Sequence, residues 1–212
     1  MARIEEAFRL AELLCAKICH ELTGLTGTLN GMLDLAAEQH PPAAEPLGFA
    51  GEFAAELDNR LKLLRAAYGP DGGPIDVAQF RVLAAALPGH HRITLELSGV
   101  PQGAVFDDRT GRVLLNLMLL AADGLPAGGT MTLSGSPRSG ITLTITGPRA
   151  AWPAGFAAML ADEAAAWAAL TSARTLQGPL TALLARGLGL RLSLLKPTAR
   201  TRMPPPVLLT CG

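Results

Sequence analysis

The sequence contains no run of eighteen apolar residues, so it predicts no helix that crosses a membrane. The opening MARIEEAFRL has two glutamates where a signal peptide requires basic residues and an uninterrupted apolar stretch. Cysteine is scarce: Cys15, Cys19 and Cys211 are the only three, and none has a metal-ligand spacing to a histidine cluster. We therefore expect a cytoplasmic protein with reduced cysteines and without a metal site.

No aspartate or glutamate follows Glu163, although the formal net charge of the chain is zero. Residues 1–76 hold twelve acids against six lysines and arginines, and residues 77–163 hold six of each. Residues 164–212, which contain only basic charged residues, are either ordinary solvated surface or a flank on which an acidic protein partner docks. Its charges are scattered, and only 4% of the residues are aromatic, so we expect no nucleic-acid partner.

Apolar residues recur at alternating spacings of four and three from the start of the chain. The series is Ile4, Phe8, Ala11, Cys15, Ile18, Leu22, Leu25, Leu29, Met32 and Ala36. This heptad pattern predicts one helix that ends near Gln39, before two prolines. A second helix is predicted by the series Phe49, Phe53, Leu57, Leu61, Leu64 and Tyr68. Because the connection is short, we expect an antiparallel hairpin domain over residues 1–69. Two helices cannot enclose both apolar faces, so we also expect a homodimer whose hairpins form a four-helix bundle.

The stretch YGPDGGP (68–74) interrupts the helical pattern and predicts a linker to a second domain over residues 75–212. We expect helices over 77–87, 107–122, 153–169 and 176–186, with Asp76 capping the first, and strands over 92–98, 130–136, 140–147 and 190–196. An apolar tail over 206–211 follows the last of these strands. The predicted fold class is α+β, with a mixed sheet covered by helices on one face.

His20 stands beside three glycines of the first helix, Gly24, Gly27 and Gly31, in the stretch CHELTGLTGTLNG. An interior glycine costs a helix about 1 kcal/mol relative to alanine, so the three require a reason. In the heptad register, His20 and Gly27 occupy the position farthest from the apolar seam, and the other two glycines lie next to it. Either feature alone is typical of a solvated surface. Together on one strip they predict a trough along which a partner's backbone or helix approaches the imidazole.

The residue types around His20 favour transfer of a chemical group between proteins. Neutral imidazole is a good nucleophile near pH 7 because its ordinary pKa is near 6.5. We expect Glu21 to hold the proton of one ring nitrogen and Lys17 to neutralise phosphoryl oxygens. Thr23 and Asn30 border the trough and are docking candidates. No second histidine follows at the spacing of a zinc-protease helix, and no nucleophile–base triad or carboxylate pair indicates hydrolysis.

The first helix resembles the phosphoacceptor helix of the ChpT-type histidine phosphotransferases of alphaproteobacteria. That family has Cys-His-Asp-Leu, then a glycine seven residues and an asparagine ten residues after the histidine. The corresponding residues here are Cys19, His20, Glu21, Leu22, Gly27 and Asn30. Glu21 replaces the family's aspartate, and Gly24 and Leu25 stand where the family has a small hydroxyl residue and a proline.

A weaker resemblance extends over the rest of the chain. RVLLNLMLLAADGLPAGGTMTLSG (112–135) is similar to the asparagine-box helix and following strand of a sensor-kinase ATP-binding domain. Asn116 matches the first asparagine of that box, but Leu120 replaces the magnesium-binding asparagine. Thr146, Gly147 and Pro148 replace the Asp-x-Gly motif that binds adenine. The resemblance therefore implies a degenerate ATPase-like domain, with no cofactor on this chain.

The resemblance implies a phosphorelay. His20 would receive a phosphoryl group from the receiver domain of a hybrid histidine kinase and pass it to the receiver of a response regulator, with Mg²⁺ brought by the receiver. Two alternatives remain open: a sensor-kinase relative that uses ATP, and a non-enzymatic adaptor that binds receivers. ATP binding would identify the kinase relative. If His20→Ala left every activity unchanged, the adaptor would be identified instead.

Overall fold

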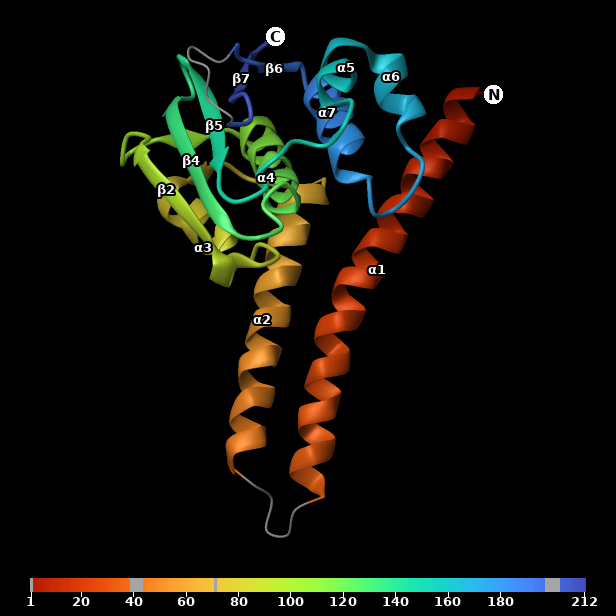
Figure 1. Cartoon of the computed structure of the whole chain (residues 1–212), viewed down its shortest axis with the longest axis vertical. Coiled ribbons are helices and arrows are strands. Elements are labelled where there is room, and N and C mark those ends of the chain that lie inside the picture. The colour runs from red at the N-terminus through yellow and green to blue at the C-terminus, as the bar shows by residue number, and fades with distance from the viewer. Residues whose placement is uncertain (1, 39–43, 71, 197–202) are drawn as a thin grey trace.

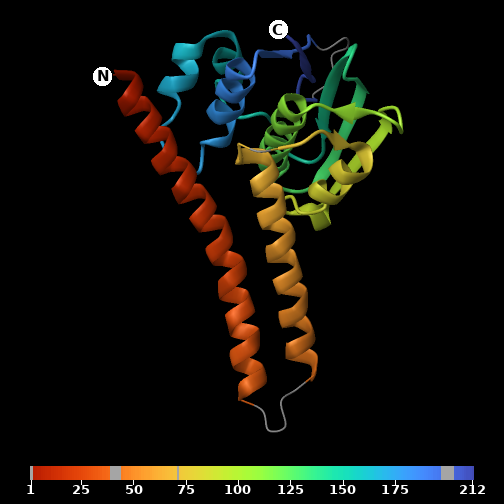
Figure 2. The same ribbon diagram turned by 180° about the vertical axis from the view of Figure 1, so that it is seen from behind.

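A computed structural model describes the chain except for residues 1, 39–43, 71 and 197–202. Two long antiparallel helices, α1 (Ala2–Ala37) and α2 (Ala44–Tyr68), lie side by side, and an α/β domain sits at the end where α2 finishes (Figure 1; Figure 2). The predicted hairpin is therefore confirmed, although its predicted boundary near Gln39 lies outside the described residues. None of the described helices combines the length and the apolar character needed to cross a membrane.

The α/β domain contains a mixed sheet, as predicted, and the apolar tail of the chain adds a fifth strand to the four that were expected. Its strands are, in spatial order, β2 (Ile93–Gly99), β4 (Gly129–Ser136), β5 (Gly140–Thr146), β7 (Val207–Cys211) and β6 (Leu190–Leu194). The pair β2–β4 is parallel, and the other three pairs are antiparallel. A separate two-residue pair joins β1 (Ile75–Asp76) to β3 (Val105–Phe106). These strands are too short to show the alternation that identifies a strand in a sequence.

The helices of this domain depart from the prediction in two places. They are α3 (Val77–Ala84), α4 (Asp108–Asp123), α5 (Phe156–Ala161), α6 (Glu163–Ala168) and α7 (Gln177–Gly187), and a 3-10 turn, η1, spans His90–Arg92. Asp76 caps α3 in a capping box with Gln79, as its position predicted, but the helix ends at Ala84 and not at Leu87. The single helix expected over 153–169 is wrong. The chain becomes extended at Asp162, whose side chain accepts a hydrogen bond from the Ala164 N–H and starts α6.

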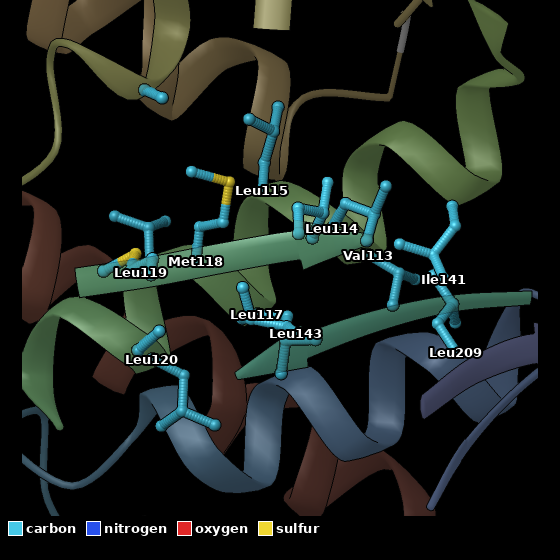
Figure 3. Packing of buried hydrophobic residues seen from close by; sticks show 14 of the residues in the cluster. Val113, Leu114, Leu115, Leu117, Met118, Leu119, Leu120, Ile141, Leu143 and Leu209 are labelled. Atoms are coloured by element: carbon cyan, nitrogen blue, oxygen red, sulfur yellow. The ribbon is translucent and has the colours of Figure 1, made fainter. Parts of the chain in front are cut away.

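Helix α4 lies at the centre of the structure. All ten of its residues from Val113 to Ala122 are buried, which is expected of a helix covered on every side. One side faces Ile141 and Leu143 of β5 and Leu209 of β7 (Figure 3), and α4 also contacts α2 and α7. It therefore connects the sheet to the hairpin that carries His20.

The N-terminal half of α1 is attached to the α/β domain. Leu13 is buried against Leu170, Leu176 and Leu180, and the Arg9 guanidinium donates a hydrogen bond to the Thr171 carbonyl oxygen over 3.0 Å. Leu13 precedes His20 by seven residues, which is about two helical turns on the same face. The α/β domain thus covers the strip of α1 just before His20 and leaves the part after it free.

Candidate functional site

The imidazole of His20 is exposed on α1, and no hydrogen bond joins it to another described side chain. Gly24, Gly27 and Gly31 are exposed on the same side. A Cβ atom added to any of them would meet nothing within 4 Å, so none is required for close packing within the chain. Together with Thr23 and Asn30, which are also exposed, these residues form the strip on which a partner could lie; we call residues 20–31 on this face the His20 strip.

The hydroxyl of Thr23 is engaged by the helix itself. Its Oγ1 donates to the Cys19 carbonyl oxygen over 2.7 Å, and Thr28 donates in the same way to the Gly24 carbonyl oxygen over 3.1 Å. Such bonds to the residue one turn earlier compete with the helical hydrogen bonds and favour a slight bend. Thr23 therefore provides a hydroxyl one position before Gly24, where the resemblance places a small hydroxyl residue, but this hydroxyl is bonded to the backbone of its own helix.

Lys17 and Glu21 face α2 rather than His20. The Lys17 Nζ lies 3.1 Å from Glu21 Oε1, and the Arg60 Nη1 of α2 lies 3.7 Å from Glu21 Oε2. The three side chains are only 12%, 13% and 7% exposed, respectively. Glu56 lies 4.0 Å from the other side of the Arg60 guanidinium. The pair thus belongs to a largely buried charge cluster, which we call the Arg60 cluster, and neither side chain is hydrogen-bonded to the imidazole.

Two further ionisable groups lie close to this cluster. Burial raises the pKa of the Asp123 carboxyl, and the positive charge of Lys17 opposes this shift in part. Burial also raises the pKa of Tyr68, and the nearby carboxylates of Glu21 and Asp123 add to the effect. The Tyr68 hydroxyl donates to Gln177 Oε1 over 2.8 Å. At the end of α2, the raised pKa values of Asp123 and Tyr68 thus favour the neutral, protonated form of each group over its anion.

Asn116, the match to the kinase asparagine box, is fully buried and occupied by protein contacts. Its Nδ2 donates to the carbonyl oxygens of Ala67, at 2.8 Å, and Arg112, at 2.9 Å. Its Oδ1 accepts from Gln177 Nε2 over 3.1 Å. Asn116 therefore joins the last turn of α2 to the α/β domain, and both polar atoms of its amide are engaged in hydrogen bonds within the protein.

The cavity lined by Gln177, the hydrogen-bond partner of Asn116, is small. It has a volume of about 160 Å³ and is lined by residues that include Leu120, Asp123, Arg174 and Gln177. Sites for small molecules usually have about 300–1,000 Å³. The part of the chain that the structure describes also contains no group of three or more histidine, cysteine, aspartate or glutamate residues that could hold a metal ion.

The Arg60 cluster and the Asn116 contacts are the parts of the site that sequence reasoning missed. Arg60 lies between Leu57 and Leu61, two residues of the apolar series of α2. This position of a charged residue next to an apolar series was the only feature of the sequence that could have indicated a buried charge. The partner of Arg60 on α1 could not be identified without the relative rotation of the two helices.

Three similarities to known proteins agree with this arrangement. Residues 71–200 match the family described as the histidine phosphotransferase C-terminal domain, which is more than half of the chain. The protein phosphotransferase ChpT of Brucella abortus (strain 2308) is 27% identical over 149 residues, or 65% of this chain and 68% of that protein. The structure of a bacterial phosphotransferase superposes with a TM-score of 0.70 over 96% of this chain and 95% of that chain, at 21% identity, and so has the same fold.

Proposed function

The chain belongs to the histidine phosphotransferase family, and we propose that it passes a phosphoryl group between receiver-domain aspartates through a phosphohistidine at His20. The observation that carries this proposal is an exposed imidazole followed by a strip without side chains at three positions. The family match itself covers residues 71–200 and does not include His20. The assignment of His20 therefore rests on its position in α1 and on the resemblance of the surrounding residues.

The proposed step is an in-line transfer in which every bond is accounted for. The unprotonated ring nitrogen of His20 forms a bond to phosphorus as the bond from phosphorus to the aspartyl oxygen breaks. The receiver's carboxylate leaves with the electron pair, and the proton on the other ring nitrogen stays there or passes to water. The same events in reverse transfer the group to a second receiver. Catalysis is then mainly a matter of positioning, with the receiver's Mg²⁺ stabilising the charge on the phosphoryl oxygens.

Glu21 and Lys17 are proposed to act on this step after they leave the Arg60 cluster. Lys17 precedes His20 by three residues, so its flexible side chain can turn toward phosphoryl oxygens held at the imidazole. Glu21 would then accept a hydrogen bond from the N–H of the other ring nitrogen, while Arg60 keeps Glu56 as its partner. The cluster is a resting arrangement in this view.

The His20 strip is the proposed docking surface for receivers. The α/β domain covers α1 at Leu13, so a partner reaches the imidazole from the Gly24–Gly31 side. Thr23 and Asn30 border this approach and would contact the partner first.

A second copy of the chain is proposed to complete the hairpin. Among the described residues, seven of the eleven exposed large apolar side chains lie on α1 and α2. Ile4 and Phe8, which are 62% and 68% exposed, belong to the predicted heptad series. Apolar groups of this size are seldom left in water on a helix with a regular seam, which supports a four-helix bundle in a dimer.

The α/β domain is proposed to support docking and dimer formation rather than to bind a nucleotide. Leu120 is buried where a magnesium ligand would be needed, the Asn116 amide is occupied, and the adjacent cavity is smaller than a nucleotide requires. These features argue against an ATP-using kinase.

A relay assay with two receivers tests the proposal. One receiver carries radiolabelled aspartyl phosphate, the second is unlabelled, and the chain is present in catalytic amount. We expect label to reach the second receiver with the wild type and not with His20→Ala. Equal transfer with His20→Ala would contradict the proposal, and labelling of the chain by ATP alone would identify a kinase.

A further inference from the structure

Strand β6 forms one edge of the five-stranded sheet, and among the described strands it pairs with β7 alone. The register between them runs without a shift from Leu190 opposite Cys211 to Leu194 opposite Val207. Hydrogen bonds mark both ends of the pair. The Leu195 N–H donates to the Pro206 carbonyl oxygen over 2.8 Å, and the Gly212 N–H donates to the Gly189 carbonyl oxygen over 3.1 Å.

These two bonds determine which backbone groups of β6 point outward. In an antiparallel pair, alternate residues exchange both of their hydrogen bonds with the neighbouring strand. Because residues 189 and 195 bond toward β7, the residues of the same parity between them do so as well. The N–H and C=O groups of Leu190, Leu192 and Leu194 therefore face away from β7, where the described residues provide no further strand.

The outward groups of β6 face a groove. Its volume is about 680 Å³, and all five residues of β6 line it together with residues of α5 and α7. Helices α5 and α7 continue past the last strand (Figure 1), so that the floor of the groove is helical. The helical lining includes Ala157, Ala161, Ala182 and Ala185, whose small side chains leave room for larger ones. The space thus has the form of a missing strand position that lies next to β6 and is floored by α5 and α7.

The charge of the groove is positive. Arg186 and Arg191 line it, and none of the described residues that line it is an aspartate or a glutamate. The Arg186 guanidinium uses one nitrogen, Nη2, to donate to the Leu160 carbonyl oxygen over 3.0 Å, which leaves its other N–H groups available. Arg191 is exposed on the face of the strand opposite to Leu190 and Leu192, which are each 6% exposed.

We propose that this groove binds an extended, acidic segment of a partner protein, which adds to β6 as a sixth strand. The main chain of the segment would pair with the outward groups of Leu190, Leu192 and Leu194. Because side chains alternate along a strand, apolar residues of the segment would point toward the alanines and acidic residues would lie beside Arg191. This surface is formed by the α/β domain and does not depend on the role proposed for His20.

Two competing roles for the β6 edge lead to different experimental results. Arg191 could act only as a charged residue that prevents pairing, as natural edge strands often carry. The edge could instead pair with β6 of a second copy of the chain. In the first case no peptide pairs with β6, and in the second the edge amides become protected as the protein concentration rises without any peptide.

The test uses the full-length protein and a synthetic heptapeptide in which glutamate and isoleucine alternate. Hydrogen exchange of the β6 amides and fluorescence anisotropy are measured as the peptide is added. We expect slower exchange at Leu190, Leu192 and Leu194, and affinity that falls with salt. The same peptide with N-methylated amides, and a peptide in which lysine replaces glutamate, are controls that should not bind.

Two variants of the protein locate the contact. Leu194→Pro removes an N–H that faces the groove and leaves the bonds to β7 in place, so it should fold and weaken binding about fivefold. Arg191→Glu should weaken binding of the acidic peptide and favour the lysine peptide. Unchanged exchange at β6, equal binding of the N-methylated peptide, or concentration-dependent protection without peptide would each overturn the proposal.

Discussion

His20 and Glu21 are adjacent in the chain, yet the imidazole of His20 is exposed while the carboxylate of Glu21 lies 3.1 Å from the Lys17 amine and is only 13% exposed. Successive residues of a helix point about 100° apart, so a histidine that faces a partner places its neighbour against α2. In the described arrangement, Glu21 therefore stabilises the hairpin through its ion pairs with Lys17 and Arg60.

Replacing Glu21 with glutamine should therefore lower both stability and activity. Lys17 and Arg60 would be left largely buried with less negative charge, so we expect the free energy of unfolding to fall by about 3 kcal/mol. If Glu21 also orients the imidazole, the rate of phosphoryl transfer at a temperature where the variant is folded should fall at least about tenfold.

Asp58→Asn is the matched control for this change. Asp58 forms an ion pair with Lys62 at the same spacing on α2, but these side chains are 62% and 61% exposed. An exposed pair contributes about 0–1 kcal/mol, so this variant should change little. A stable Glu21→Gln variant would contradict the structural role, and an unchanged transfer rate would restrict Glu21 to that role. Urea denaturation and single-turnover transfer measure the two effects.

The glycines of the His20 strip should be replaceable without loss of the fold. Gly27→Gln introduces a side chain where nothing lies within 4 Å of the new Cβ, so the helix should gain about 1 kcal/mol. The same side chain would occupy the path of a docked receiver and should weaken transfer at least about tenfold. Gly187→Gln in α7 is equally open and serves as the control. Equal activity of the two variants would show that receivers do not use the strip.

The seam of α1 should hold the dimer together. Phe8→Glu places a charge in the predicted interface, so sedimentation should report a monomer at concentrations where the wild type is a dimer. Val82→Glu changes a side chain on α3 that is exposed to nearly the same extent, 66% against 68%, and should leave the dimer intact. A Phe8→Glu variant that remains dimeric would exclude this part of the seam from the interface.

Tyr68 should remain protonated well above pH 10. It is the only tyrosine of the chain, so phenolate absorbance near 295 nm reports on it alone. Burial raises the pKa of its hydroxyl in the folded protein above the ordinary value near 10. The associated stability is fully present below pH 10 and decreases as pH rises further, by about 1.4 kcal/mol per pH unit, because the unfolded chain loses this proton first.

As pH is raised above 10, the phenolate absorbance of Tyr68 should therefore increase together with the fraction of unfolded protein. Phenolate formation near pH 10 in protein that is still folded would contradict the burial of Tyr68. Tyr68→Phe should remove this part of the pH dependence while losing the hydrogen bond to Gln177.

Those parts of the fold that depend on local spacing were predictable from the sequence. The hairpin follows from the heptad series, and the start of α3 follows from Asp76, because capping and periodicity act within a few residues. The exposure of His20 follows from the same register. Asp162, in contrast, lies inside an alanine-rich stretch that has high helix propensity, and its capping bond with Ala164 divides the predicted helix in two.

The contacts between distant segments were not predictable from local spacing. The network that joins Asn116 to Ala67 spans 49 residues, and Arg60 meets Glu21 only because of how α2 is rotated against α1. A single sequence contains the residues of such a cluster but not their pairing. Asn116 is the example: its place in the sequence resembles that of a nucleotide ligand, but its hydrogen bonds to Ala67 and Gln177 could not be predicted from that resemblance.

The most direct test of the central proposal is whether a receiver's phosphoryl group is transferred to His20. A receiver domain with radiolabelled aspartyl phosphate would be mixed with the wild type, with His20→Ala and with His91→Ala, which changes a histidine outside the hairpin. We predict acid-labile, base-stable label on the wild type and on His91→Ala, and none on His20→Ala. Label on His20→Ala, or no label on the wild type from any receiver of a broad panel, would contradict the account.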